Sequence, residues 1–329
     1  MCGGFLAYKK MMIKFEKKPS VRFSEKKKKN YFLIYFLTFF EIVILAVILL
    51  FVKKSVFSKE ERVVEVKQQR LTATSANHSA WIKKGKLYIA GEKYHSQDVI
   101  KKWKQLIQVA ISDDHIIALD QSGTVYATGL NASYQCEING LCEVSYIEAG
   151  NGCSIAVMND GTIQVFGILD AVMRQELLTE ENVETVALGD QHVAVLHKNG
   201  TVSAYGKKEN GQCDVTRWKN IQQIDVGYTF TIGLNKEGKI IYAGDDSYGT
   251  KNSTKWKSIV KIAAGNNHVL GINEQGMVCA AGRNSQAECN VQSWEAMISI
   301  SAGYDHSIGI NTEGNFFAIG FNGNGQCDI

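Results

Sequence analysis

Residues 187–225, ALGDQHVAVLHKNGTVSAYGKKENGQCDVTRWKNIQQID, decide the fold, because the chain from about residue 64 to its end can be laid over this stretch seven times. Two glycine columns recur at steps of 38 or 39 residues. They are Gly85, Gly123, Gly161, Gly200, Gly238, Gly276, Gly314 and Gly91, Gly129, Gly167, Gly206, Gly244, Gly282, Gly320. A third column, called here the histidine slot, holds His78, His115, Cys153, His192, Phe230, His268 and His306. Self-similarity at a period of this size indicates a repeat architecture.

Each copy predicts four short strands, as residues 259–291 illustrate. The stretches IVKIAAG, HVLGI, MVCAAG and ECNV are separated by turn residues such as Gly276. The middle stretches are apolar on both faces, so these strands need cover on both sides. Seven four-stranded sheets arranged radially provide that cover. We therefore expect an all-β, seven-bladed β-propeller of four-stranded blades over residues 64–329.

The two ends of the repeat region predict how the ring closes. The last copy stops at GQCDI, residues 325–329, and lacks the segment that follows this motif elsewhere. Residues 64–74 precede His78 by the matching distance, and we expect them to supply the missing strand, so that both ends meet in one sheet. Copy two carries an insert, EINGLCEV, and copy three has the spacing of a short helix at about residues 170–178.

The N-terminal part predicts a membrane anchor. Residues 1–30 carry nine Lys and one Arg against Glu16 and Glu25, whereas residues 31–52 are 22 residues with the single charge of Glu41. Seventeen of the 22 are Leu, Ile, Val or Phe, which favours insertion by roughly 5–10 kcal/mol, against about 3 kcal/mol for Glu41. We predict a basic cytoplasmic segment (1–30), a transmembrane helix (31–52) and a linker (53–63), with the N-terminus cytoplasmic and the propeller outside, as a single-pass signal-anchor protein of the plasma membrane. The role of Glu41 stays open.

The repeat motifs resemble a known family. GQCDV at 211–215, GQCDI at 325–329 and AECNV at 287–291, with Trp103, Trp218, Trp256 and Trp294, are similar to the repeats of the regulator of chromosome condensation family in its bacterial form. The resemblance covers about residues 64–329 and implies a seven-bladed propeller. That family's fold serves nucleotide exchange on a small GTPase, chromatin binding and inhibition of secreted β-lactamases, so the resemblance alone does not fix a function.

The residue types argue against catalysis, and we predict no catalytic, cofactor-binding or metal-binding residues. Equivalent positions of neighbouring blades lie roughly 10 Å apart, too far for the histidine slot to gather one zinc ion at about 2.0–2.1 Å. We expect hydrogen bonds from these histidines to hold their loops. Cys136, Cys213, Cys289 and Cys327 share one slot and are interpreted as small buried hydrophobes. A disulfide between Cys136 and Cys142 is left open.

Strand alternation places the loop before the histidine slot and the loop after the second glycine column on one face. The candidate binding residues on this face are acidic, amide or tyrosine side chains: Asp190, Tyr228, Asp245, Asp246, Tyr248, Asn266, Tyr304 and Asp305. The other face is rich in lysine and is expected to lie toward the membrane. We predict that the first face binds an extracellular protein or a cell-wall component, with no nucleic acid. The alternative is an inhibitor or regulator of an exported enzyme, and guanine nucleotide exchange ranks below both.

Overall fold

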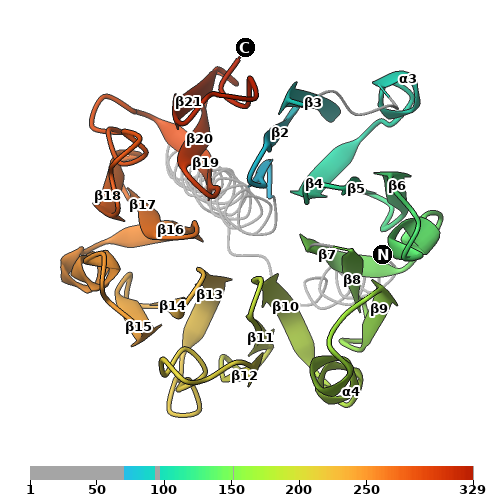
Figure 1. Ribbon diagram of the computed structural model, residues 1–329, viewed down its shortest axis with the longest axis horizontal. Coiled ribbons are helices and arrows are strands. Elements are labelled where there is room, and N and C mark those ends of the chain that lie inside the picture. The colour runs from blue at the N-terminus through green and yellow to red at the C-terminus, as the bar shows by residue number, and fades with distance from the viewer. Residues whose placement is uncertain (1–69, 93–96, 151, 329) are drawn as a thin grey trace, which may run out of the picture. The chain divides into compact units, whose positions relative to one another are not determined.

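The computed structural model describes residues 70–92, 97–150 and 152–328, which form seven antiparallel sheets arranged around a central axis (Figure 1). Each sheet, here called a blade and numbered 1 to 7 along the chain, is built from three consecutive strands. The predicted segments 1–30, 31–52 and 53–63 lie outside the described residues. Among the residues that are described, no helix has the length and apolar character needed to cross a membrane.

Within each blade the first strand lies nearest the axis and the third lies outermost (Figure 1). The inner strands are β1 (Thr72–Thr74), β4 (Leu106–Ile111), β7 (Val144–Gly150), β10 (Val183–Leu188), β13 (Ile221–Val226), β16 (Ile259–Ala264) and β19 (Met297–Ala302). The middle strands are β2 (His78–Lys83), β5 (His115–Asp120), β8 (Cys153–Met158), β11 (His192–His197), β14 (Phe230–Asn235), β17 (His268–Asn273) and β20 (His306–Asn311). The outer strands are β3 (Lys86–Gly91), β6 (Val125–Gly129), β9 (Ile163–Gly167), β12 (Val202–Gly206), β15 (Ile240–Gly244), β18 (Val278–Gly282) and β21 (Phe316–Gly320).

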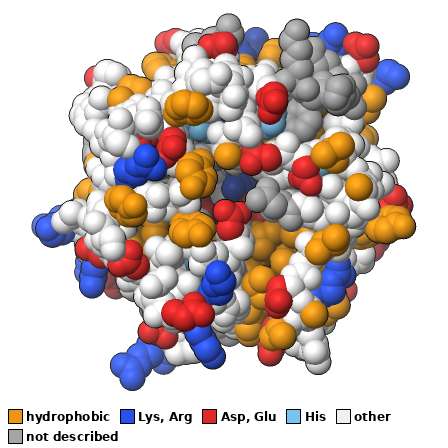
Figure 2. All heavy atoms as spheres, viewed as in Figure 1, with side chains coloured by type: hydrophobic (Ala, Val, Ile, Leu, Met, Phe, Trp, Pro, Cys, Tyr) orange, Lys and Arg blue, Asp and Glu red, His pale blue; other side chains and the backbone are white. Residues whose placement is uncertain are grey.

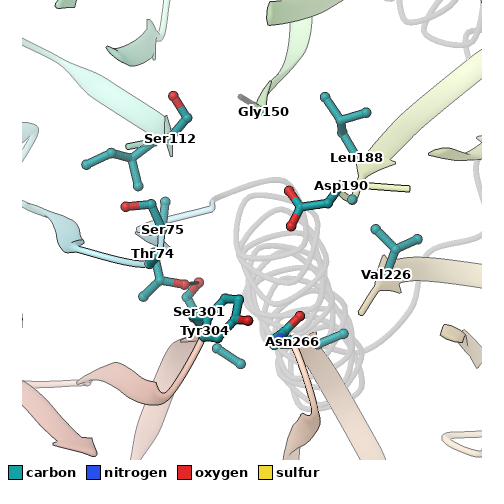
Figure 3. Close-up of a pocket in the computed structure, with 18 of the residues that line it drawn as sticks. Thr74, Ser75, Ser112, Gly150, Leu188, Asp190, Val226, Asn266, Ser301 and Tyr304 are labelled. Carbon is teal, nitrogen blue, oxygen red and sulfur yellow. Dashed lines mark hydrogen bonds between the residues drawn. The ribbon is translucent and has the colours of Figure 1, made fainter. Parts of the chain in front are cut away.

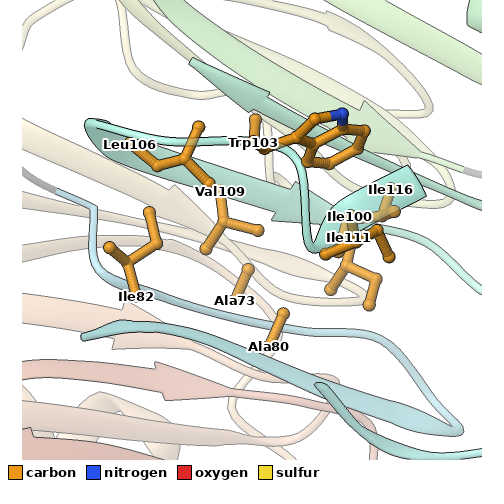
Figure 4. Packing of buried hydrophobic residues seen from close by; sticks show 10 residues of the cluster. Ala73, Ala80, Ile82, Ile100, Trp103, Leu106, Val109, Ile111 and Ile116 are labelled. Atoms are coloured by element: carbon orange, nitrogen blue, oxygen red, sulfur yellow. The ribbon is translucent and has the colours of Figure 1, made fainter. Parts of the chain in front are cut away.

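The middle strands are covered on both faces, as their apolar sequences predict. Every residue of β5 and of β20 is buried. Between blades 1 and 2, Ala80 and Ile82 of β2 belong to the same apolar cluster as Val109 of β4 (Figure 4). Packing of each blade on the next therefore forms the core, and the hydrophobic effect holds the ring together.

A tryptophan packs against the middle strand at the start of several blades. A Cβ atom added to Gly233 would lie 2.7 Å from Trp218, and one added to Gly271 would lie 3.0 Å from Trp256. Both distances are too short for an ordinary contact between two carbons, which lies near 3.5–4.0 Å. Glycine at this point of the middle strand therefore makes room for the indole of the preceding connection.

The predicted fourth strand is wrong for the described residues. In blade 6 the segment expected to form it, around Cys289, folds into tight turns instead. The Cys289 N–H donates to Asn284 Oδ1 at 2.8 Å, and Ala287 has a positive φ of 69°. Because side chains satisfy its N–H groups, this backbone has no need of a neighbouring strand. The blades consequently have three strands.

The predicted closure within one sheet is also wrong, since β1 pairs with β2 and blade 7 is complete from its own strands. The ends of the ring meet between two blades. Thr72 Oγ1 lies 2.8 Å from Ser299 Oγ, and Gln326 Nε2 donates to the Ala76 carbonyl at 3.3 Å. Polar contacts of blade 1 with blade 7 thus close the propeller, while residues 64–69 of the predicted strand lie outside the described residues.

The helix predicted at about 170–178 is confirmed as α4 (Ala171–Leu178). Its N-cap is Asp170, whose Oδ1 accepts hydrogen bonds from the backbone N–H of Val172 at 3.0 Å and of Met173 at 3.1 Å. The helix buries Leu177 against blade 3 and blade 4. Shorter helical turns are α3 (Gln97–Ile100), η2 (Gln135–Ile138) and η3 (Thr250–Lys255).

Candidate binding site: the central pocket

A cavity of about 280 Å³ opens where the inner strands end. All seven blades contribute to it through the last residues of the inner strand and the loop that leads to the middle strand. Figure 2 shows this end of the propeller, where acidic and hydrophobic side chains surround a central hollow. The end of the propeller that carries this cavity is called the pocket face below.

The rim of the pocket is formed by the residue two positions before the histidine slot. Five of these residues line the cavity with polar or aromatic side chains: Asp113, Asp190, Tyr228, Asn266 and Tyr304. In Figure 3 the side chains of Asp190, Asn266 and Tyr304 are directed toward the space between the strand ends.

Hydrogen bonds tie the rim loops of neighbouring blades together. The Tyr228 N–H donates to the Asn266 carbonyl at 3.1 Å, and the Asn266 N–H donates to the Gly303 carbonyl at 3.1 Å. Between blades 1 and 2, the Asn77 N–H donates to Asp113 Oδ1 at 3.1 Å. The rim is therefore held in place by its own backbone, which preserves the arrangement of its side chains.

The floor of the pocket holds a cluster of charged side chains from three blades. Arg70 Nη1 forms an ion pair with Glu148 Oε2 and donates to the Tyr146 hydroxyl at 3.1 Å. The Tyr146 hydroxyl donates in turn to Glu148 Oε2 at 3.0 Å. Asp225 accepts backbone N–H groups from Val226 at 2.8 Å and from Ala264 at 2.9 Å. Arg70 is the only Lys or Arg among the described residues that line the pocket, where it faces four carboxylates.

The protonation behaviour of these carboxylates follows from burial. Burial raises the pKa of Glu148, against the attraction of Arg70, and it also raises the pKa of Asp225. Burial, together with the charge of Asp113, raises the pKa of Asp190. For Asp113 burial acts in the same upward direction, but hydrogen bonds, led by His78, outweigh it and lower the pKa. Four carboxyl groups therefore share the pocket with one arginine, and burial shifts Glu148, Asp190 and Asp225 toward the neutral form, whereas the hydrogen bonds of Asp113 favour its charged form.

The structure brings together half of the predicted binding residues. Asp190, Tyr228, Asn266 and Tyr304 line the pocket. The other four lie outside its lining on the same end of the propeller, as the bond from the Asp245 N–H to the Thr229 carbonyl shows. The four are Asp245, Asp246, Tyr248 and Asp305.

Three of the outer four have structural partners, and the first is Asp245, whose Oδ1 accepts a hydrogen bond from the Ser247 hydroxyl at 2.8 Å. Asp246 Oδ1 accepts the Lys251 N–H at 2.7 Å at the start of η3. Asp305 forms an ion pair with Arg283 at 2.8 Å. These three carboxylates hold their own loops, whereas Tyr248 is 53% exposed and remains accessible for contact.

The floor cluster is the part of the site that the sequence analysis missed. The signal was present in inner-strand sequences such as YIEAG at 146–150 and QQIDVG at 222–227, where polar residues alternate with apolar ones. Alternation of this kind indicates a strand with one face away from the apolar core. Only the ring arrangement shows that this second face is a shared central channel.

The histidine slot forms hydrogen bonds between blades. His115, His192, His268 and His306 each place Nε2 2.7–3.0 Å from the hydroxyl of a Ser or Thr in the next blade: Ser154, Thr231, Ser307 and Ser79, respectively. The expected hydrogen bonds to the histidine's own loop are confirmed in blades 1 and 2, where Nδ1 contacts Ser75 at 3.3 Å and Ser112 at 2.8 Å. The expectation is wrong in blades 4, 6 and 7, where the buried Nδ1 of the histidine has no hydrogen-bond partner among the described residues. These histidines are fixed in the scaffold.

One of these contacts has the layout of a catalytic triad. Asp114 Oδ1 lies 2.7 Å from His115 Nδ1, and His115 Nε2 lies 2.7 Å from Ser154 Oγ. Both His115 and Ser154 are 0% exposed. A substrate carbonyl must come within about 3 Å of such a hydroxyl to react, and burial prevents that approach here.

The cysteine slot is less buried than predicted. Cys289 is buried, whereas Cys136, Cys213 and Cys327 are half-buried, and the thiols of all four donate to backbone carbonyls at 3.1–3.5 Å. Cys136 and Cys142 are both free thiols. Within the described ranges, no group of three or more His, Cys, Asp or Glu side chains is arranged to hold a metal ion.

Three stretches of the propeller match the model of a known repeat family. Residues 106–135, 259–287 and 297–326, in blades 2, 6 and 7, match the family model of the regulator of chromosome condensation (RCC1) repeat. Protein pim1 of Schizosaccharomyces pombe is 32% identical over 112 residues, which are 34% of this chain and only 17% of that protein.

Solved structures share the fold at low sequence identity. Prp20p from Saccharomyces cerevisiae is similar with a TM-score of 0.57 and 16% identity, over 80% of this chain and 85% of that one. The ectodomain of the receptor kinase ACR4 from Arabidopsis thaliana gives a TM-score of 0.56 and 14% identity, over 79% and 98%. These likenesses show a shared propeller fold, and the repeat matches show regulator of chromosome condensation repeats in blades 2, 6 and 7.

Proposed function

We propose that this chain is a membrane-anchored binding protein whose propeller faces outward and holds a protein or a cell-wall component on its pocket face. The observation that carries the proposal is the rim, where loops from different blades present acidic and tyrosine side chains around one cavity. Tyrosine supplies large contact area at low entropic cost and is enriched in interfaces. The described histidines of the slot are committed to blade contacts, which favours binding over catalysis.

The outward orientation is supported by charge. Residues 1–30 are strongly basic and precede the apolar stretch 31–52, a pattern that retains the N-terminus in the cytoplasm. The end of the propeller opposite the pocket face exposes Lys84, Lys104, Arg217, Lys219, Lys255 and Lys257. Anionic headgroups attract such residues by about 1 kcal/mol each when close. A propeller of this fold also forms the ectodomain of ACR4, and we assign this chain to the bacterial form of the family.

Thiol labelling of intact cells tests the orientation. Cys142 is exposed, so a membrane-impermeant maleimide should label the full chain in intact cells, and Cys142→Ser should remove most of that label. Labelling that requires permeabilised cells would place the propeller inside and would contradict the outward orientation.

Capture of partners tests the binding face. The full chain in detergent should retain one or more cell-surface or secreted proteins that the triple variant Tyr228→Ala, Tyr248→Ala, Tyr304→Ala loses. The matched control is Tyr88→Ala, a tyrosine that is 43% exposed on β3, away from the pocket lining. Equal capture by the triple variant would show that the pocket face is not the binding site.

Two other functions of this fold give distinct outcomes in the same experiment. A captured hydrolase whose activity falls in the complex would establish an inhibitor or regulator of an exported enzyme. Prp20p is described with binding properties to Gsp1p and histones, and guanine nucleotide exchange in this chain would require a small GTPase as the captured partner. We rank exchange last because an outward propeller would not meet a cytosolic GTPase.

A further inference from the structure

An exposed apolar patch adjoins the pocket on blades 2 and 3. Leu130, Tyr134, Ile168 and Val172 are each 62–70% exposed, higher than any other large hydrophobic residue in the described ranges. They belong to the loops that follow β6 and β9, to the start of η2 and to the first turn of α4. In Figure 2 hydrophobic side chains gather to the right of the central hollow, on the side where Figure 1 labels blades 2 and 3.

The patch coincides with the two copies that depart from the repeat. Leu130 and Ile168 directly follow the second glycine column, where blades 4, 5 and 6 have Lys207, Asp245 and Arg283. The repeat therefore tolerates a charged side chain here, so the fold does not require Leu or Ile. Large exposed apolar surfaces mark interaction sites, and we attribute these four residues, the most exposed large hydrophobic side chains in the described ranges, to binding.

Hydrogen bonds join the patch to the pocket rim through Asp114, the neighbour of rim residue Asp113. The Asp114 carbonyl accepts the Leu130 N–H at 2.8 Å. The Asp114 carboxylate accepts Gln135 Nε2 at 2.7 Å and the Gly152 N–H at 3.2 Å. The Gly152 carbonyl accepts the Ile168 N–H at 2.8 Å. These hydrogen bonds fix the loops that carry the apolar patch relative to the loops of the acidic rim.

The pocket itself suits one cationic side chain. Its volume of about 280 Å³ lies just below the range of roughly 300–1,000 Å³ typical of small-molecule sites. Asp113 and Asp190 lie on the rim, Glu148 and Asp225 lie below it, and the single arginine is already paired with Glu148. Tyr228 and Tyr304 border the same opening, and tyrosine rings attract a cation within about 6 Å of their centre.

We propose that the pocket face binds a protein segment that places an Arg or Lys side chain in the acidic pocket and rests neighbouring apolar side chains on Leu130, Tyr134, Ile168 and Val172. This inference rests on the proposed function and names the chemistry of the partner. Charge complementarity selects the cation and its orientation, and burial of the apolar side chains supplies affinity.

Selection from random 12-residue peptides displayed on phage, against the full chain in lipid nanodiscs, tests the inference. We expect selected peptides to contain Arg or Lys within a few residues of Leu, Ile, Phe or Trp. Asp113→Asn with Asp190→Asn should weaken their binding at least tenfold, and Leu130→Ser with Ile168→Ser should do so by a similar factor. These substitutions are isosteric or lie on the surface, so the fold should be retained.

Matched controls lie at the other end of the blades. Glu274→Gln in the turn after β17 removes an exposed carboxylate, and Val260→Ser removes a side chain that is 46% exposed at the start of β16. Neither should change peptide binding by more than about twofold. Replacing the Arg or Lys of a selected peptide by Gln should mimic the loss caused by the Asp113 and Asp190 variant.

Failure of the inference is distinguishable from failure of the proposed function. Peptides that lack cations, or that bind the aspartate variant as well as the native chain, would overturn the cationic segment, while loss in the tyrosine triple variant would keep the pocket face as a binding site. If no peptide is enriched, or if binding survives every pocket-face variant, both the inference and the face assignment are wrong.

Discussion

The residue type in the histidine slot follows the residue it meets in the next blade. Four histidines of the slot, His115, His192, His268 and His306, are opposite a Ser or Thr in the next blade. Cys153 and Phe230 occupy the slot where the corresponding position of the next blade is Val193 or Val269. His78, whose counterpart there is Ile116, bonds instead to the Glu92 carbonyl at 3.0 Å. A histidine therefore occupies the slot where its Nε2 finds a hydrogen-bond partner.

Removal of one such hydroxyl should destabilise the propeller. Thr231 accepts a hydrogen bond from His192 Nε2 at 2.8 Å and donates to the Gln212 carbonyl at 2.7 Å, all in buried surroundings. Thr231→Val preserves shape but leaves both partners unsatisfied, which costs about 1–3 kcal/mol for each buried group. Thr231→Ser keeps the hydroxyl and should cost less than half as much. If urea unfolding shows the same loss of free energy of unfolding for Thr231→Val and Thr231→Ser, packing and not the hydrogen bond matters here.

The buried histidines should also make the propeller sensitive to acid. Burial lowers the pKa of His192 to about 4, of His268 to about 3 and of His306 to about 4. In the unfolded chain the pKa of a histidine is about 6.5. Below that pH the unfolded chain binds protons that the folded chain does not. The contribution of these neutral histidines to the free energy of unfolding is therefore complete above pH 6.5 and is lost as the pH falls toward 4. Together the three histidines lower the free energy of unfolding by about 4 kcal/mol for each pH unit that the pH falls near pH 5.

The carboxyls of Glu148, Asp190 and Asp225 act in the opposite direction, because their pKa values are raised by burial. They reduce the net slope at the acid end. Urea unfolding at pH 7, 6 and 5 measures how the free energy of unfolding changes with pH. All five tryptophans lie at or after residue 81, so their fluorescence reports on the propeller alone. His192→Gln should reduce the slope by about 1.4 kcal/mol per pH unit. An unchanged slope in that variant would contradict neutral burial of His192.

Among the elements, the middle strand depends on the space that glycine leaves for tryptophan. Gly233→Val would drive a side chain into Trp218, and overpacking of this kind costs about 1–3 kcal/mol. In a Trp218→Leu background the same change should cost much less, because the clashing ring is gone. Urea unfolding of the four proteins gives the coupling energy. If the losses of free energy of unfolding from Gly233→Val and Trp218→Leu simply add in the double variant, Gly233 is required for another reason.

At the same scale, the sequence predicted the first three strands of each blade and the helix at about 170–178, because apolar runs between turn residues and the spacing of apolar residues in a helix are local signals. The fourth strand was mispredicted because residues such as Glu288 and Cys289 lie in a short apolar-polar stretch that resembles a strand. Only the side-chain bonds, from the Gln286 N–H to Glu288 Oε2 at 2.7 Å and from the Cys289 N–H to Asn284 Oδ1, reveal a turn.

For the whole molecule, strand direction predicted correctly that the candidate residues share one end of the propeller. It did not predict which of them meet, because the loop before the middle strand points to the axis, whereas the loop after the outer strand does not. Asp190 and Tyr304 therefore line the pocket, and Asp245 does not. Contacts that join distant blades, such as Arg70 with Glu148, depend on the ring and leave no local pattern.

Site-specific photo-cross-linking tests the central claim, that the pocket face is where this protein binds its partner. A benzophenone amino acid is placed at Tyr304 on the rim, or at Lys219 on the opposite end, in the full chain in living cells. Our account predicts discrete cross-linked products from position 304 that are absent from position 219 and that disappear when Asp113→Asn and Asp190→Asn are added. Products from position 219 alone, or equal products from both positions, would contradict it.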